Sequence, residues 1–239
     1  MSFLRKKRFW SDVSVVGSTG GFVIHLDGRG VKTPAKHDLN VPTRAAAEMI
    51  AAEWAVVEEE IDPAFMPATL WANVAIDRVG EKHGEVVDIL AAYGATDLLC
   101  YRATHPEVLV KRQAAVWDAP LAWAKAAFGA PLNVTQGIIP VDQPNQSVAN
   151  LRFEVARMEP FTLSAFHDLV HISGSLVLSL AIFHQEMDVE SVWEAAQVDE
   201  IWQSEFWGED EDAAAAATKK RASFVFAAKL LDSVADHAY

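Results

Sequence analysis

Cysteine is nearly absent from this chain: Cys100 is the single one among 239 residues. One cysteine excludes a disulfide within the chain, and it also excludes any Cys-x-x-Cys metal or redox motif. Cys100 stands in the apolar run 98–101, so we expect a buried, unreactive thiol rather than a catalytic nucleophile. This cysteine usage is typical of a reducing compartment.

Long apolar runs are also missing. No run reaches the roughly 18 residues that a membrane-spanning helix requires, and the longest, from Leu176 to Phe183, contains Ser179. The first residues show neither the apolar region nor the small-residue cleavage site of a signal peptide. We therefore expect a bacterial cytoplasmic protein with no membrane insertion.

Basic residues are scarce, with 20 Lys and Arg against 33 Asp and Glu and a formal net charge of −13. The charge is uneven, because residues 1–44 carry +5 and residues 45–239 carry −18. An acidic body repels phosphate groups, which argues against a nucleic-acid partner. The basic run 5–8 is short enough to be a solvated terminus.

The pattern of apolar residues divides the chain in two. Phe22, Ile24 and Leu26 alternate with their neighbours as in a half-buried strand, and strands are expected near residues 9–16, 22–26, 31–34 and 39–42. From Thr43, which can cap a helix, the period becomes helical. Helices are expected near residues 43–57, 67–79, 82–93, 106–128, 145–158, 162–185, 188–207 and 213–236. We predict an α+β fold with a β-rich N-terminal domain (residues 1–42) and an α-helical domain (residues 43–239).

One motif resembles an enzyme site, His167-Asp168-Leu169-Val170-His171. Two histidines four residues apart share one helix face and can bind Zn²⁺, with Glu190 as a conceivable third ligand. This would make the protein a zinc-dependent hydrolase, the alternative function. The other interpretation is a core helix with two hydrogen-bonded histidines. The Gly-rich segments 17–21 and 28–30 are interpreted as turns, so we predict no cofactor and no small-molecule substrate.

The segment 186–212 contains eleven Asp and Glu residues and no Lys or Arg. On a helical wheel one apolar stripe should face the core: Val192, Ala195, Val198, Trp202 and Phe206. The residues opposite to it are Glu190, Trp193, Gln197, Glu200, Ser204 and Trp207. Tryptophans among carboxylates are typical of a surface that binds a basic partner. Alternatively, the last helix or Phe224 and Phe226 cover both tryptophans.

Several segments resemble the assembly chaperones that act on the alpha subunit of F1-ATPase, in matching order over about residues 8–208. Those near the start are Arg8-Phe9-Trp10 with Val13, Gly20-Gly21-Phe22, Leu26-Asp27-Gly28-Arg29, Lys32-Thr33-Pro34, Val41-Pro42 and Ala52-Glu53-Trp54. The most specific are Thr96-Asp97, Cys100-Tyr101-Arg102, Pro106-Glu107, Leu109, Gln113 and Trp117-Asp118. Those near the end are Glu200, Gln203 and Trp207-Gly208.

The resemblance implies a binding role rather than a reaction. The family is expected to hold the free alpha subunit where the beta subunit will sit, until beta displaces it during F1 assembly. It has an acidic residue in its C-terminal motif, and Glu200 is matched to it, with Glu194 and Asp199 as alternatives. Together with Trp193, Trp207 and Glu190, these residues form the predicted partner-binding set. The related eukaryotic proteins are mitochondrial.

Overall fold

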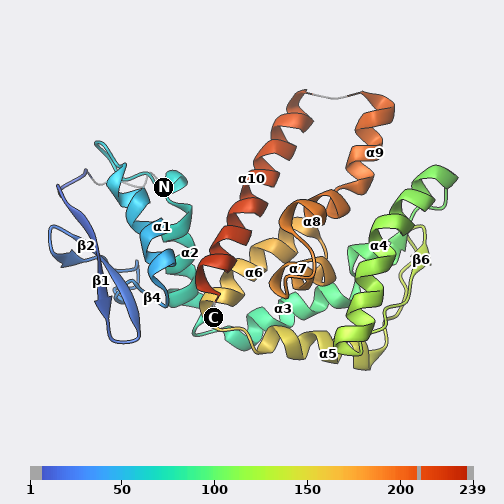
Figure 1. The fold of residues 1–239 in the computed structure, drawn as a ribbon, viewed down its shortest axis with the longest axis horizontal. Coiled ribbons are helices and arrows are strands. Elements are labelled where there is room, and N and C mark those ends of the chain that lie inside the picture. Colours follow the sequence, from blue (N-terminus) through green and yellow to red (C-terminus); the bar gives the residue numbers. More distant parts are fainter. Residues whose placement is uncertain (1–6, 209–210, 236–239) are drawn as a thin grey trace. The chain divides into compact units, whose positions relative to one another are not determined.

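The computed structural model describes residues 7–208 and 211–235 (Figure 1). The chain divides into two compact units. One is formed by residues 1–83, 159–165 and 229–239, and the other by residues 84–158 and 166–228. The predicted boundary at residue 42 follows the last strand of the first unit, whereas that unit itself continues to His83.

The first unit contains a small antiparallel sheet. Its central hairpin joins β1 (Val13–Ser18) to β2 (Gly21–Leu26), and the short strands β3 (Arg29–Gly30) and β4 (Asn40–Val41) both pair with β2. Gly20 turns the hairpin with a φ of 78°, a backbone conformation that strongly favours glycine. At Gly21 a Cβ atom would lie 2.2 Å from the Val41 carbonyl oxygen, so a larger residue would push β4 away.

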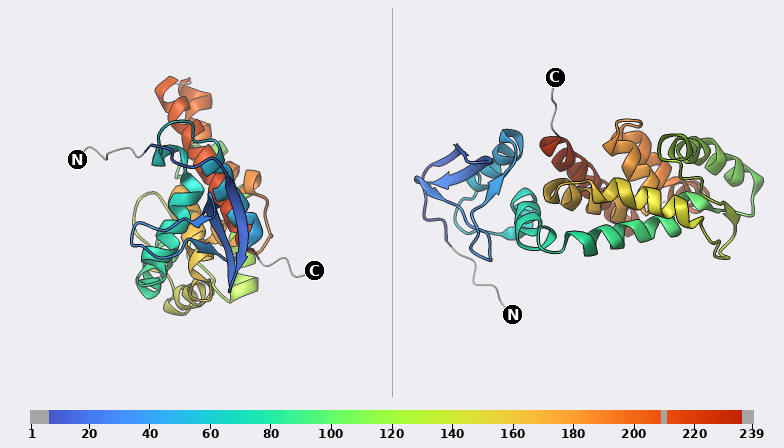
Figure 2. Two further views of the ribbon diagram at one scale, coloured as in Figure 1. Left: turned by 90° about the vertical axis from the view of Figure 1, so that its left-hand side faces the viewer. Right: turned by 90° about the horizontal axis from the view of Figure 1, so that it is seen from below.

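Two helices of this unit follow the sheet, α1 (Arg44–Ala55) and α2 (Pro67–Val74), and π-helical residues Ala75–Val79 extend α2. α1 packs against β1 and β2 (Figure 2). Thr43 caps α1 as predicted, because its hydroxyl oxygen accepts a hydrogen bond from the Ala46 amide at 3.2 Å. A core cluster joins sheet and helices through Trp10, Leu26, Val57 and Met66, with Val13, Val31, Trp54 and Ile61 packed on it.

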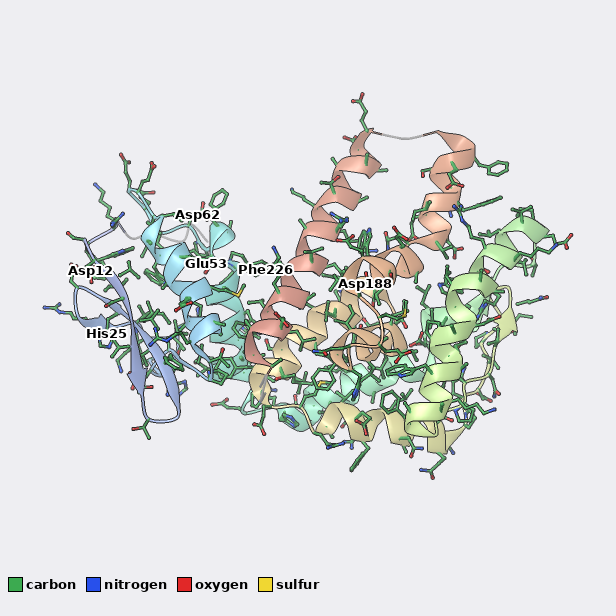
Figure 3. The ribbon with its side chains drawn as sticks, in the orientation of Figure 1. Asp12, His25, Glu53, Asp62, Asp188 and Phe226 are labelled. Atoms are coloured by element: carbon green, nitrogen blue, oxygen red, sulfur yellow. The ribbon has the colours of Figure 1, made fainter. Side chains whose placement is uncertain are left out.

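Glu53 on α1 caps the neighbouring helix α2 (Figure 3). Its carboxylate accepts hydrogen bonds from the backbone amides of Ala68 (2.6 Å) and Thr69 (2.8 Å) and from the Thr69 hydroxyl (2.7 Å). These amides belong to the first turn of α2 and have no partner within the helix. Burial raises the pKa of the Glu53 carboxyl. A residue of the Ala52-Glu53-Trp54 motif therefore fixes α2 against α1.

Helices build most of the second unit. They are α3 (His83–Ala95), α4 (Glu107–Phe128), α5 (Asn145–Ala156), α6 (Pro160–Ser173), α7 (Leu176–Phe183), α8 (Val189–Ala196), α9 (Val198–Trp207) and α10 (Glu211–Val234), of which α3, α6 and α10 also contribute residues to the first unit. A two-stranded parallel sheet pairs β5 (Tyr101–Arg102) with β6 (Thr135–Gln136). The largest fully buried side chains of this unit include Trp117, Phe166, Leu169 and Phe224. Among the described residues, none of the helices combines the length and the apolar character needed to cross a membrane.

The predicted α+β fold class is confirmed, with short strands at the start and helices after them. Two predicted helices are each divided in the structure. The expected helix 162–185 breaks at Gly174, whose φ is 72°. The expected helix 188–207 breaks at Gln197, which separates α8 from α9. The buried thiol of Cys100 is confirmed as well, and burial raises its pKa to about 12.

Candidate partner-binding site

An open groove of about 760 Å³ lies between α9 and the first half of α10, which stand next to each other in Figure 1. One wall comes from the α8–α9 segment: Trp193, Gln197, Glu200, Ile201, Gln203, Ser204 and Gly208. The other wall belongs to α10: Ala213, Ala214, Ala216, Ala217 and Lys220. Because alanine side chains are short, the backbone of a partner can approach this second wall closely.

Glu200 is an exposed residue of the groove, in the first turn of α9. The free amides of a helix N-terminus favour a carboxylate there. Gln203 and Gly208, which belong to the same C-terminal motif, line the groove as well. Trp207 ends α9, but its side chain lies outside the described part of the structure. The motif that the sequence singled out therefore maps largely to one recess.

Trp193 is the clearest correction to the predicted surface. It was expected on the solvent-facing side, yet it is 8% exposed and its ring centroid lies 5.5 Å from that of Phe224. The alternative in which Phe224 covers it is the one observed. Trp193 nevertheless is one of the residues that line the groove.

Trp193 lies before the helix break at Gln197 and is buried by its packing on Phe224, whereas the break itself, with a φ of −111° and a ψ of 14°, affects the residues that follow it. A wheel drawn through residues 188–207 assumes one continuous helix, whereas the break changes the direction in which later residues point. Gln197, expected on the surface, is 6% exposed, and Phe206, expected in the core, is 66% exposed. Val192, Ala195 and Val198 are buried as predicted.

Asp199 points to α4 rather than being one of the residues that line the groove. Its Oδ1 accepts a hydrogen bond from Gln113 Nε2 at 2.7 Å, while Gln113 Oε1 accepts one from the Ala103 amide at 2.8 Å. One helical turn further along α4, Trp117 Nε1 donates to the Ala195 carbonyl at 2.7 Å. These two bonds hold α8 and α9 on α4, on either side of the break.

Arg102 in turn contacts Trp117, the α4 residue that holds α8. It is buried, its guanidinium lies 5.2 Å from the centroid of the Trp117 ring, and its Nη2 lies 2.9 Å from Asp118 Oδ1. Its Nε also donates to the Leu99 carbonyl at 2.8 Å. Residues of the motif from Arg102 to Asp118 thus fix the positions of α8 and α9.

Further acids of the segment make ion pairs between helices. Glu190 on α8 accepts a hydrogen bond from Arg221 on α10 at 2.6 Å. Glu205 on α9 is bound in a bidentate manner by Arg112 on α4, at 2.7 and 2.8 Å. Arg112 lowers the pKa of the Glu205 carboxyl, and Glu205 raises that of Arg112. Sequence reasoning missed the Glu205 pair, because nothing local links residues 93 positions apart.

Among the described residues, no third ligand joins the histidine pair of the zinc-hydrolase alternative. The rings of His167 and His171 are stacked with centroids 6.1 Å apart, and His171 Nδ1 lies 3.2 Å from the Tyr93 hydroxyl. Glu190, the conceivable third ligand, is engaged by Arg221. Within residues 7–208 and 211–235, three or more His, Cys, Asp or Glu side chains are nowhere grouped so that they could hold a metal ion.

A family model described as ATP12 chaperone protein matches residues 7–125. Over 96% of its length the chain is also similar to the crystal structure of Atp12 from Paracoccus denitrificans, with 42% identity, 98% coverage of that chain and a TM-score of 0.91. The chain belongs to the ATP12 chaperone family. The resemblance to assembly chaperones of ATP synthase is thereby confirmed at the level of the family.

Two further relatives extend the comparison. The crystal structure of Atu1473, a candidate chaperone from Agrobacterium tumefaciens, shares 37% identity and a TM-score of 0.89, and the match covers 96% of this chain and 86% of that one. The protein atp12, mitochondrial, of Schizosaccharomyces pombe is 24% identical over 220 residues, which are 87% of this chain and 75% of that protein. The similarity to bacterial structures agrees with the predicted bacterial member of the family.

Proposed function

We propose that this ATP12-family protein is an assembly chaperone that binds the free alpha subunit of F1-ATPase and is displaced by beta during F1 assembly. It acts by binding, without catalysis, in the bacterial cytoplasm. Membership of the ATP12 chaperone family supports the general role. The resemblance of the C-terminal motif supports the more specific partner.

The observation that carries the proposal is the groove between α9 and α10. Glu200, Gln203 and Gly208 of the C-terminal motif line it together, opposite a wall of alanines. Ile201 and the alanines of α10 add apolar surface, which can cover apolar surface of an unassembled subunit that would otherwise aggregate. Glu200 adds a carboxylate that selects a basic side chain at the edge of that surface.

Such a groove suits a chaperone from which the alpha subunit must dissociate. Affinity differences between related complexes lie mostly in the dissociation rate, and an open, partly polar recess gives a modest interface. Beta can then compete for the same surface of alpha. The acidic charge of residues 45–239 favours encounter with basic surface without fixing a tight complex.

The test is the affinity of the purified protein for isolated alpha subunit, measured for the wild type and for Glu200→Lys. We expect the variant to bind alpha about tenfold more weakly, because it places a like charge against the basic side chain. Glu58→Lys, the same reversal at an exposed residue of the other unit, should bind as the wild type does. Equal binding by all three proteins would remove Glu200 from the site.

A further inference from the structure

Glu194, a predicted partner-binding residue, does not line the groove but a separate hollow of about 340 Å³ between α4 and the segment 186–195. The lining residues from α4 are Ala115, Val116, Ala119, Pro120 and Trp123. Those from the turn before α8 and from α8 itself are Glu186, Met187, Ser191, Glu194 and Ala195. Most of this lining is therefore apolar or aromatic, and among the described residues its charged members are the carboxylates Glu186 and Glu194.

The turn that carries Glu186 and Met187 is fixed by the backbone. The amides of both residues donate to the Ala181 carbonyl, at 2.9 and 3.2 Å. Asp188 then caps α8 (Figure 3), accepting from the Ser191 amide at 2.9 Å and from its hydroxyl at 2.7 Å. The wall opposite α4 is thus held in place before any partner arrives, which reduces the entropy lost on binding.

Trp123 supplies the aromatic part of the hollow. Its ring is half-buried, with Phe128 packed edge-on at a centroid distance of 4.9 Å and His184 at 6.0 Å. An indole ring beside carboxylates suits the side chain of lysine or arginine, whose methylene groups pack on apolar surface while the charged end meets a carboxylate or the ring face. Among the residues that the structure describes, neither Lys nor Arg lines this hollow, so none of them neutralises the charge of Glu186 and Glu194 from within its walls.

The hollow also continues the proposed binding site. α8 lies between the two recesses, because Trp193 lines the groove and the next two residues, Glu194 and Ala195, line the hollow. Trp117 holds α8 at the Ala195 carbonyl. One partner segment that crosses α8 would reach both recesses.

From this arrangement we infer that the α4–α8 hollow is a second docking point for the alpha subunit, and that it takes a lysine or arginine side chain from an apolar segment of that partner. The inference rests on the proposed function. Two modest contacts on one partner strengthen each other through their effective concentration, and beta can break them one after the other.

The experiment measures binding of isolated alpha subunit at low and high salt for three variants. Glu186→Gln/Glu194→Gln removes the charge and keeps the size, Ala119→Trp fills the hollow from its exposed edge, and Glu58→Gln is the control. We expect the first two to bind about tenfold more weakly at low salt. The charge-free variant should also lose part of the salt dependence of the wild type, because fewer charges are left to screen.

The outcomes separate this inference from the proposed function. If the wild type does not bind alpha, the proposed function fails and the inference fails with it. If the wild type binds alpha and Glu200→Lys weakens it, but the charge-free hollow variant binds at full strength and with unchanged salt dependence, the hollow alone is rejected. A change in the self-association of the chaperone without a change in alpha binding would identify a second copy as the occupant and would equally reject the inference.

Discussion

At the scale of single residues, Asp97 is a buried carboxyl group of the second unit that several hydrogen bonds hold in place. It is fully buried, and its carboxylate accepts hydrogen bonds from the Ser175 hydroxyl (2.7 Å), the Val177 amide (3.0 Å) and the Leu99 amide (3.1 Å). It thereby ties residues 97–100 to the first turn of α7. Burial nevertheless raises the pKa of Asp97 to about 6, above the 3.8 of an exposed aspartate.

This raised pKa has a definite sign for stability. Between about pH 4 and pH 6 the folded protein keeps a proton on Asp97 that the unfolded chain has lost, so the contribution of Asp97 to the free energy of unfolding falls as pH rises. We expect the wild type to lose roughly 2 kcal/mol relative to Asp97→Asn between pH 4 and pH 7. Urea unfolding of both proteins across this range measures the difference. A difference that stays constant, or that grows with pH in favour of the wild type, would contradict the assignment.

At the scale of helices, the junction of α8 and α9 depends on α4. Gln113 and Trp117 hold the two helices through Asp199 and the Ala195 carbonyl. Asp199, which was predicted as a partner contact, therefore has a second candidate role as a support for Glu200. Replacing an acid by an amide removes charge while keeping an oxygen that can accept. This separates the two roles of Asp199.

We expect Asp199→Asn to bind alpha within about twofold of the wild type, since its amide oxygen can still accept from Gln113. Asp199→Leu leaves the buried Gln113 amide unpaired, which costs about 1–3 kcal/mol, and should weaken alpha binding several-fold, as should Gln113→Leu. The measurement is alpha affinity together with thermal unfolding of each variant. If Asp199→Asn binds as poorly as Asp199→Leu, the charge itself contacts the partner.

The same helices show what the sequence could and could not predict. The apolar period located most of the helices, including α4, α5 and α10, within a few residues of their observed bounds. Gly174 and the capping residue Ser175, whose hydroxyl accepts from the Leu178 amide at 3.0 Å, could have marked the start of α7. Gln197 carries no comparable signal, since it is neither Gly nor Pro. The break there is flanked by tertiary contacts with α4, and the burial of Trp193 depends on a separate tertiary contact with Phe224.

Short strands escaped prediction for a related reason. β5 and β6 contain two residues each and pair in parallel, although all of α4 lies between them in the sequence. A two-residue strand has no alternation to detect, and its partner is distant in the sequence. The candidate site divides in the same way: Glu200 and its motif were found from local sequence, whereas the groove and the hollow exist because of how α4, α8, α9 and α10 pack.

At the scale of the whole molecule, the protein is acidic, and the function proposed for it is binding rather than catalysis. Its net charge of −13 is concentrated after residue 44, and the recesses on both sides of α8 combine apolar surface with carboxylates. Both features suit a partner that exposes apolar and basic surface only until it is assembled. The function proposed for this member of the ATP12 family therefore requires that it binds alpha selectively and that beta displaces it.

Selective binding of alpha and displacement by beta can be tested in one measurement. Purified protein is mixed with isolated alpha subunit, separated by size-exclusion chromatography, and run again after beta subunit is added. We expect a complex with alpha, no complex with beta alone, and release of the chaperone when beta joins alpha. Failure to bind alpha, or a chaperone that stays bound after beta has assembled with it, would contradict the account.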